Sequence, residues 1–99
     1  STPIAAATAD PIVVVQNGNG RPGSAGAVAE ALSVAGFEVA DATNATRDDH
    51  GTTLVVARPT ALTSAERIRE ALGYGSVMTG SVPSGIDVVV IVGLDAPAP

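Results

Sequence analysis

Apolar residues recur along this chain with the spacings typical of strands and helices, and Gly or Pro separates most of the segments. β-Branched or alternating apolar runs predict four strands, at residues 12–15, 37–41, 52–57 and 86–92. The i, i+3, i+4, i+7 spacing predicts helices at residues 24–35 and 63–72. Residues 73–85 are predicted to be a long loop with a short extended piece at 76–82. The order β-α-β-β-α-β predicts one small α/β domain, a two-layer sandwich with a four-stranded sheet and two helices, in which the second and third strands form an antiparallel hairpin.

Particular residues mark the ends of the two predicted helices. Gly36 follows the first helix and suits the left-handed C′ position of a Schellman ending, which would place Phe37 against the last helical turn. Thr63 and Glu66 have the spacing of a capping box that would begin the second helix. Gly73 would end that helix.

The first and last strands are apolar at nearly every position, as strands covered on both faces usually are. Two short helices that share a face would leave part of the other face apolar and open, and such a surface marks a partner site. One set of strand residues is expected to share a face: Val13, Val15, Leu54, Val56, Val88, Val90 and Val92. Their neighbours would point the other way: Ile12, Val14, Val55, Val89 and Ile91. An open set would pair with a second copy, a related domain or another protein.

Composition excludes several classes of protein. The 99 residues contain no Cys, which excludes a disulfide framework and a thiolate zinc site. Five Arg and no Lys against ten acidic residues give a net charge of −5, a poor electrostatic match for nucleic acid. The longest apolar run, residues 88–92, is far shorter than the ~20 residues of a membrane span, so no membrane insertion is expected of this segment.

The two ends of the sequence lack hydrophobic periodicity. Residues 1–10 are rich in Ala, Thr and Pro, and residues 95–99 are rich in Ala and Pro. Both are predicted to be linkers around a domain at residues 11–94. A domain between two linkers is usually a module of a larger protein.

The one motif that suggests a ligand lies between the first strand and the first helix. Gly18-x-Gly20-x-x-Gly23 has the spacing of a dinucleotide-binding loop, and Asp41 follows about twenty residues further on. Pro22 has no amide hydrogen to offer a phosphate, and four strands fall short of the full nucleotide fold. A plain strand-to-helix turn is the simpler interpretation. An anion or a sugar hydroxyl at the helix N-terminus, or a nucleotide, remains the alternative.

Other polar residues give weaker signals. His50 is the only His and follows two Asp residues, but three adjacent residues of a turn seldom form a metal site, so no metal is expected. Tyr74 would stack on a sugar ring or pack against the core. No acid–base pair, metal set or activated nucleophile is visible, so neither enzymatic activity nor a cofactor is expected. The candidate residues for binding a ligand or partner are Asn17, Gly18, Asn19, Gly20, Arg21, Gly23, Ser24 and Tyr74.

A series of residues in order along the chain resembles the signature of the LytR C-terminal domain family. The first half of the series is Val13, Val15, Asn17, Gly18, Gly23, Ala25, Ala31, Leu32, Gly36, Phe37 and Val39. The second half is Thr52, Thr53, Arg58, Pro59 and residues 91–95. The resemblance covers about residues 11–95. The chain departs from the family pattern at Asn19, where Ser or Thr is usual, and at Ser24, where Leu is usual.

The resemblance implies a role in the cell envelope of Gram-positive bacteria, many of them actinobacteria. Domains of this family lie outside the membrane, either behind a single transmembrane anchor or on LytR-CpsA-Psr phosphotransferases, which attach glycopolymers such as arabinogalactan to peptidoglycan. The implied function is a non-catalytic accessory module that binds another envelope protein, a second domain of this family or cell-wall glycan. The alternative function is a cytosolic regulatory domain that binds a nucleotide or small ligand through residues 18–23.

Overall fold

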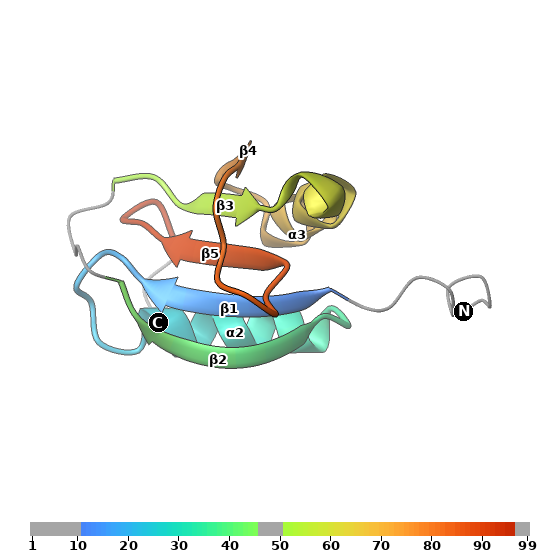
Figure 1. Ribbon diagram of the computed structural model, residues 1–99. Coiled ribbons are helices and arrows are strands. Elements are labelled where there is room, and N and C mark those ends of the chain that lie inside the picture. The colour runs from blue at the N-terminus through green and yellow to red at the C-terminus, as the bar shows by residue number, and fades with distance from the viewer. Residues whose placement is uncertain (1–10, 46–50, 97–99) are drawn as a thin grey trace.

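The computed structural model describes residues 11–45 and 51–96 (Figure 1). The predicted linker at residues 1–10, the Asp48-Asp49-His50 turn and residues 97–99 of the predicted tail lie outside the described residues. The elements follow in the order β1 Ile12–Asn17, α2 Ser24–Val34, β2 Glu38–Asn44, β3 Leu54–Ala57, the 3₁₀ turn η1 Pro59–Ala61, α3 Leu62–Leu72, β4 Ser76–Thr79 and β5 Val88–Val92. The predicted α/β class is confirmed.

The sheet has five strands in the order β2-β1-β5-β3-β4, so the prediction of four strands was wrong. The additional strand is β4, which lies within the extended piece predicted at residues 76–82. Its sequence signal is weak because it has only four residues, Ser-Val-Met-Thr, and glycines stand on both sides. The predicted hairpin was also wrong, since β2 pairs with β1 and β3 pairs with β4 and β5.

Two β-α-β units build this sheet, and the last strand joins them. β1 and β2 run parallel with α2 between them in sequence, and β3 and β4 run parallel with α3 between them. β5 lies between the units, parallel to β1 and antiparallel to β3. Every residue of β5 is apolar, which explains why this strand takes the most buried place in the sheet.

Both helices pack on one face of the sheet, where they cover the hydrophobic core (Figure 1). Fully buried strand residues meet the helices at Val13, Val15, Val55, Ala57, Val88, Val90 and Val92. The predicted faces were therefore correct for β1 and β5 but inverted for β3, where Leu54 and Val56 lie on the opposite face. The register explains this result, because Val55 pairs with Val90 and Val56 pairs with Val89, and paired residues share a face.

Residues 80–87, here called the crossing segment, run over the face that the helices leave free. Figure 1 shows this connection passing in front of β3 and β5 on its way from β4. It lies close to the sheet, because a Cβ atom on Gly80 would be 3.1 Å from Cγ1 of Val56. Under it, Val89 is only 6% exposed. The apolar face expected to be open is thus partly covered by the chain itself, while Met78 at its margin remains 46% exposed.

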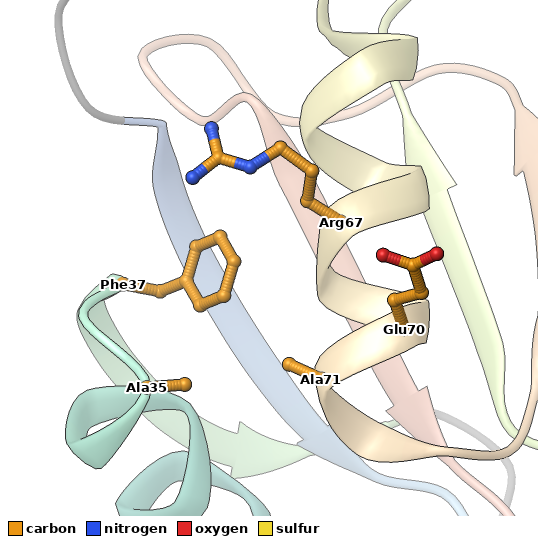
Figure 2. Close-up of a pocket in the computed structure, with 5 residues that line it drawn as sticks. All are labelled: Ala35, Phe37, Arg67, Glu70 and Ala71. Carbon is orange, nitrogen blue, oxygen red and sulfur yellow. The ribbon is translucent and has the colours of Figure 1, made fainter.

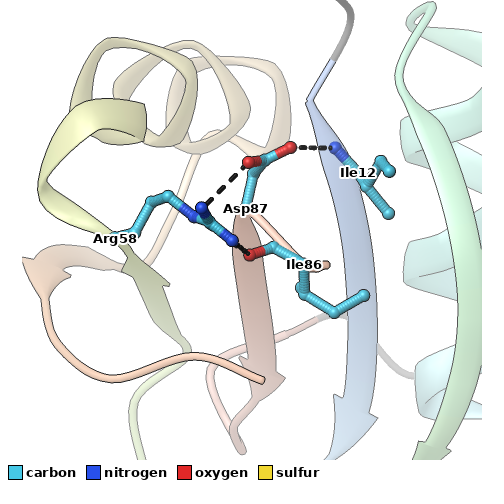
Figure 3. A network of polar contacts seen from close by, with 4 residues as sticks. All are labelled: Ile12, Arg58, Ile86 and Asp87. Carbon is cyan, nitrogen blue, oxygen red and sulfur yellow. Dashed lines mark hydrogen bonds and ion pairs between the residues drawn. The ribbon is translucent and has the colours of Figure 1, made fainter. Parts of the chain in front are cut away.

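Polar contacts fix the end of the crossing segment (Figure 3). The Asp87 carboxylate accepts a hydrogen bond from the backbone N–H of Ile12 at 2.8 Å, and the Asp87 N–H donates to the Ile12 carbonyl at 2.9 Å. The guanidinium of Arg58 donates to the Ile86 carbonyl and lies 3.5 Å from the Asp87 carboxylate. These contacts join the beginning of β1 to the end of β3 and align β5 between them.

The first helix ends as predicted. Gly36 has φ +99°, its N–H donates to the Ser33 carbonyl at 3.0 Å, and the Phe37 N–H donates to the Leu32 carbonyl at 3.0 Å. These two bonds define the Schellman motif. Phe37 packs against the core that contains Leu32.

The second helix ends as predicted but does not begin as predicted. Gly73, with φ +85°, ends α3. The capping box was wrong, because η1 leads directly into α3 and places Thr63 inside the helix, behind an Ala61 N-cap that has no side-chain hydrogen bond. Thr63 and Glu66 are both exposed on the helix.

Substitution by alanine should have opposite effects at two glycines, one inside α2 and one just after its end. Gly36→Ala should destabilise the domain by about 1 kcal/mol, because a Cβ disfavours the positive φ. Gly26→Ala, inside α2 with open space around it, should stabilise the domain by about 0.5–1 kcal/mol. Thermal unfolding of both variants beside the wild type measures the difference, and an unchanged midpoint for Gly36→Ala would contradict the assigned helix end.

Candidate functional site

Most of the predicted site residues meet at one edge of the sheet. β1 and β5 end at this edge, and β3 and β4 begin there, since β3 runs antiparallel to β5. The topology therefore brings together the loop after β1, the residue before β3, the residues before β4 and the turn after β5. This group, called the polar edge below, consists of residues 17–24, Thr53, Tyr74 and residues 93–96.

The glycine loop is held by hydrogen bonds from its own asparagines. Asn17 Oδ1 accepts from the N–H groups of Asn19 at 3.1 Å and Gly20 at 3.2 Å, and Asn17 Nδ2 donates to the Arg21 carbonyl at 2.7 Å. Asn19 Oδ1 accepts from the Arg21 N–H at 2.8 Å, and the Gly18 N–H donates to the Val92 carbonyl. The amides of residues 18–21 are therefore already occupied, and the loop resembles a rigid turn more than a phosphate cradle.

Asn19 also connects this loop to the turn that follows β5. Its Nδ2 donates to the Gly93 carbonyl at 2.9 Å, and the residue is only 8% exposed. Asn19 is one of the two departures from the family pattern, and in this chain it is a structural residue of the polar edge. Its side-chain amide links two segments that are distant in sequence.

The first turn of α2 contributes less to the site than its sequence suggests. Gly23 precedes the helix with φ +84° and offers no side-chain cap. The Ser24 side chain is 2% exposed, and its hydroxyl has no hydrogen-bond partner among the described residues. A ligand outside the fold therefore does not reach this hydroxyl, and Ser24 belongs with the buried residues.

Three residues that were not predicted as site residues, Asp95, Thr53 and Gly93, hold the polar edge together. Asp95 Oδ1 accepts from the Thr53 N–H at 2.9 Å and from the Thr53 hydroxyl at 2.7 Å. The Thr53 hydroxyl in turn accepts from the Gly93 N–H at 2.9 Å. No side chain fits at Gly93, since a Cβ there would lie 2.4 Å from the Thr52 carbonyl carbon. Asp95 and the buried Ala96, both expected in the tail, thus pack with the domain. The Thr-Thr pair before β3 and the Gly-Leu-Asp run after β5 were the available sequence signals.

Three side chains at the polar edge have the character of recognition residues. The Arg21 guanidinium donates to the carbonyls of Leu94 and Ala96, both at 3.1 Å, and so is fixed in direction. Leu94 is 49% exposed. Tyr74 packs against the core with part of its ring, and burial, together with the nearby Asp95 charge, raises the pKa of its phenol.

A shallow hollow, separate from the polar edge, lies between the two helices. It has a volume of about 490 Å³ and is lined by Ala35, Phe37, Arg67, Glu70 and Ala71 (Figure 2). The Arg67 guanidinium carbon lies 5.7 Å from the centre of the Phe37 ring. Phe37, expected only as a structural residue, therefore also forms the wall of a shallow open surface.

Neither place contains a cluster of metal-ligand side chains among the described residues. Across residues 11–45 and 51–96, no group of three or more His, Asp or Glu side chains is arranged to hold a metal ion. In the same part of the chain, neither helix is long and apolar enough to cross a membrane. The polar edge presents a fixed cation, a phenol and an exposed apolar side chain on a hydrogen-bonded frame.

The mixed five-stranded sheet, with both helices on one face, defines a small α/β domain. The chain belongs to the LytR C-terminal domain family, whose sequence model, described as LytR cell envelope-related transcriptional attenuator, matches residues 11–95. The resemblance found in the sequence is thus confirmed, and with it the association of the domain with the cell envelope.

A solved structure supports the same assignment. The chain is similar to the C-terminal domain of RV0431, known from a solution structure, with 26% identity and a TM-score of 0.59 over 94% of this chain and 80% of that chain. Comparison with curated proteins gives no significant match.

Tyr74 provides a spectroscopic test of the polar edge, because it is the only Tyr and the chain has no Trp. In the folded domain its pKa should lie above the ordinary 10.0, so the stability that its neutral form contributes is present below pH 10 and is lost as the pH rises through the raised pKa. Asp95→Asn should lower the pKa only in part, since burial is the larger cause. Tyrosinate absorbance during a pH titration measures both values, and a midpoint at or below 10.0 in the folded protein would refute this environment.

The bonding of the glycine loop predicts that nucleotides do not bind there. Titration with NAD or ATP should leave the amide NMR shifts of residues 18–24 unchanged. Saturable shifts at micromolar nucleotide would contradict this prediction and favour the cytosolic regulatory alternative.

Proposed function

We propose that this domain is a non-catalytic accessory module on the extracytoplasmic side of the cell envelope, where it binds a protein of the cell-wall assembly machinery. The parent protein would be a LytR-CpsA-Psr glycopolymer phosphotransferase or a protein with a single membrane anchor. Family membership supports the envelope role. The match to the C-terminal domain of RV0431 supports it as well.

The observation that carries the proposal is the construction of the polar edge. Arg and Tyr are among the side chains in which interface binding energy concentrates, and this edge contains Arg21 and Tyr74, with the half-exposed Leu94 as an apolar contact. Arg21 is fixed by two carbonyls, and the turn that bears Leu94 is fixed by Asp95 and Thr53. A surface ordered before binding loses little entropy when a partner docks.

Charge favours a protein over an anionic polymer as the partner. The chain has a net charge of −5, and the Asp95 carboxylate lies within the polar edge beside Tyr74. A polyanion would be repelled by this field, whereas a protein that presents donors to Asp95 and an apolar pocket to Leu94 would complement it. Neutral cell-wall glycan is the second ligand class compatible with this surface.

A pair of matched arginine variants tests the proposal. The probes are the catalytic domain of a LytR-CpsA-Psr phosphotransferase and, separately, soluble peptidoglycan fragments. Binding of the protein should shift the amide signals of residues 17–24 and 93–96, and Arg21→Ala should weaken it by about tenfold or more. Arg67→Ala removes the same charge from the hollow between the helices and should leave the affinity unchanged.

Three results would overturn or redirect this assignment. Shifts confined to the hollow lined by Phe37 and Arg67 would move the binding site away from the polar edge. Saturable binding of the peptidoglycan fragments alone would make glycan, and not protein, the ligand. Binding of neither probe would refute the proposed function.

A further inference from the structure

The two edge strands of the sheet differ in whether their outward N–H and C=O groups are protected from pairing with another strand. β2, at one edge, has a bulge: Val13 pairs with Val39 and Val14 pairs with Asp41, which leaves Ala40 as the extra residue. Bulges and charged side chains are the usual means by which proteins prevent pairing at a sheet edge. β2 has both, because Asp41 and Glu38 are charged.

One of the outward amides of β2 is also occupied. The Ala45 N–H donates inward to the Asn17 carbonyl, so alternation directs the Ala42 N–H outward, away from β1. Asp41 Oδ1 accepts from this Ala42 N–H at 2.9 Å. A strand that approached β2 would therefore meet a bulge, two carboxylates and a donor already in use.

β4, at the other edge, has none of these protections. Residues 73–86 contain no charged side chain, and no strand of the described chain lies beyond β4. The N–H groups of Ser76 and Gly80 donate inward to the carbonyls of Thr53 and Ala57. Alternation therefore directs the N–H and C=O groups of Val77 and Thr79 outward.

We propose that β4 pairs antiparallel with β4 of a second copy of this domain, about a two-fold axis at Met78. In this register Val77 faces Thr79 of the second copy, and each such pair exchanges two hydrogen bonds, so the two pairs make four. Met78 faces Met78 of the second copy as a pair without backbone bonds, in which side chains approach most closely. The two sheets become one continuous sheet.

The apolar face of the sheet supports this register. Val14 pairs with Val89, Val89 with Val56, and Val56 with Met78, so a row of apolar side chains crosses four strands. The row ends at Met78, which is 46% exposed, while Val89 in its middle is 6% exposed. Pairing at β4 continues the row into the second copy and covers the side chain that a single copy leaves in water.

Electrostatics explains why a second copy would choose this edge. Two copies that each have a net charge of −5 repel one another, and the repulsion is smallest where uncharged surfaces meet. The same pairing at β2 would place Asp41 and Glu38 of one copy against those of the other. The inference does not rest on the proposed function, because Arg21 and Leu94 lie outside β4.

Sedimentation of the full chain tests the pairing. A concentration series from about 10 µM to about 1 mM should show a weak, reversible dimer, as expected of a short strand pair. Met78→Glu places like charges on the two-fold axis and should weaken the dimer by about tenfold or more. Val34→Glu makes the same change of charge at a residue that is 84% exposed on α2, and should preserve the dimer apart from a small effect of net charge.

Cysteine cross-linking provides an independent measurement, because the chain has no Cys of its own. Opposed residues without backbone bonds have Cα atoms about 4.5 Å apart, a separation that a disulfide spans. Met78→Cys should therefore form disulfide-linked dimers under mild oxidation much faster than Val34→Cys.

The negative results are distinct from those of the proposed function. A monomer at about 1 mM with equal cross-linking of both cysteine variants would overturn the pairing. A dimer that Met78→Glu leaves intact would place the contact elsewhere. Neither outcome affects the result expected for binding of the Arg21→Ala variant to the phosphotransferase catalytic domain.

Discussion

The need to cover β5 on both faces determines the rest of this structure. Val88, Val90 and Val92 face the helices and Val89 faces the crossing segment, so the strand has no polar side for solvent. One β-α-β unit on each side supplies its neighbours, and the two helices cover one face. Since a chain of this size has only a small core, the crossing segment provides the cover over Val89 on the other face.

The polar edge depends on the same strand. β5 ends at a glycine packed against the backbone before β3, and the following turn provides carbonyls for Arg21 and a carboxylate for Thr53. The position of the recognition residues is thus set by backbone contacts at the end of the core. Substitutions at Gly93 or Thr53 would alter binding by displacing the backbone that positions Arg21 and Leu94, without contact between the substituted residue and the partner.

Local sequence predicted local structure well and strand pairing poorly. The end of α2 at Gly36 could be foreseen because positive φ and a Schellman motif are local, and most of the helix and strand positions followed from periodicity. The hairpin and the face of Leu54 and Val56 were wrong because pairing is decided by burial of β5, a residue run far from both. The glycine loop and Tyr74 were predicted separately as candidate binding residues, and their place at the same edge of the sheet follows from strand pairing that no local pattern shows. Asp95 was assigned to a linker because nothing local shows that Thr53 lies beside it.

The position of β5 also sets the order in which the domain can be completed. The strand that joins the two β-α-β units is the last one to leave the ribosome or to cross a membrane. Until it arrives, β1 and β3 have exposed apolar edges and share no hydrogen-bond ladder, so the cooperative unit does not yet exist. The five-stranded sheet can therefore be completed only after β5 has been added to the chain.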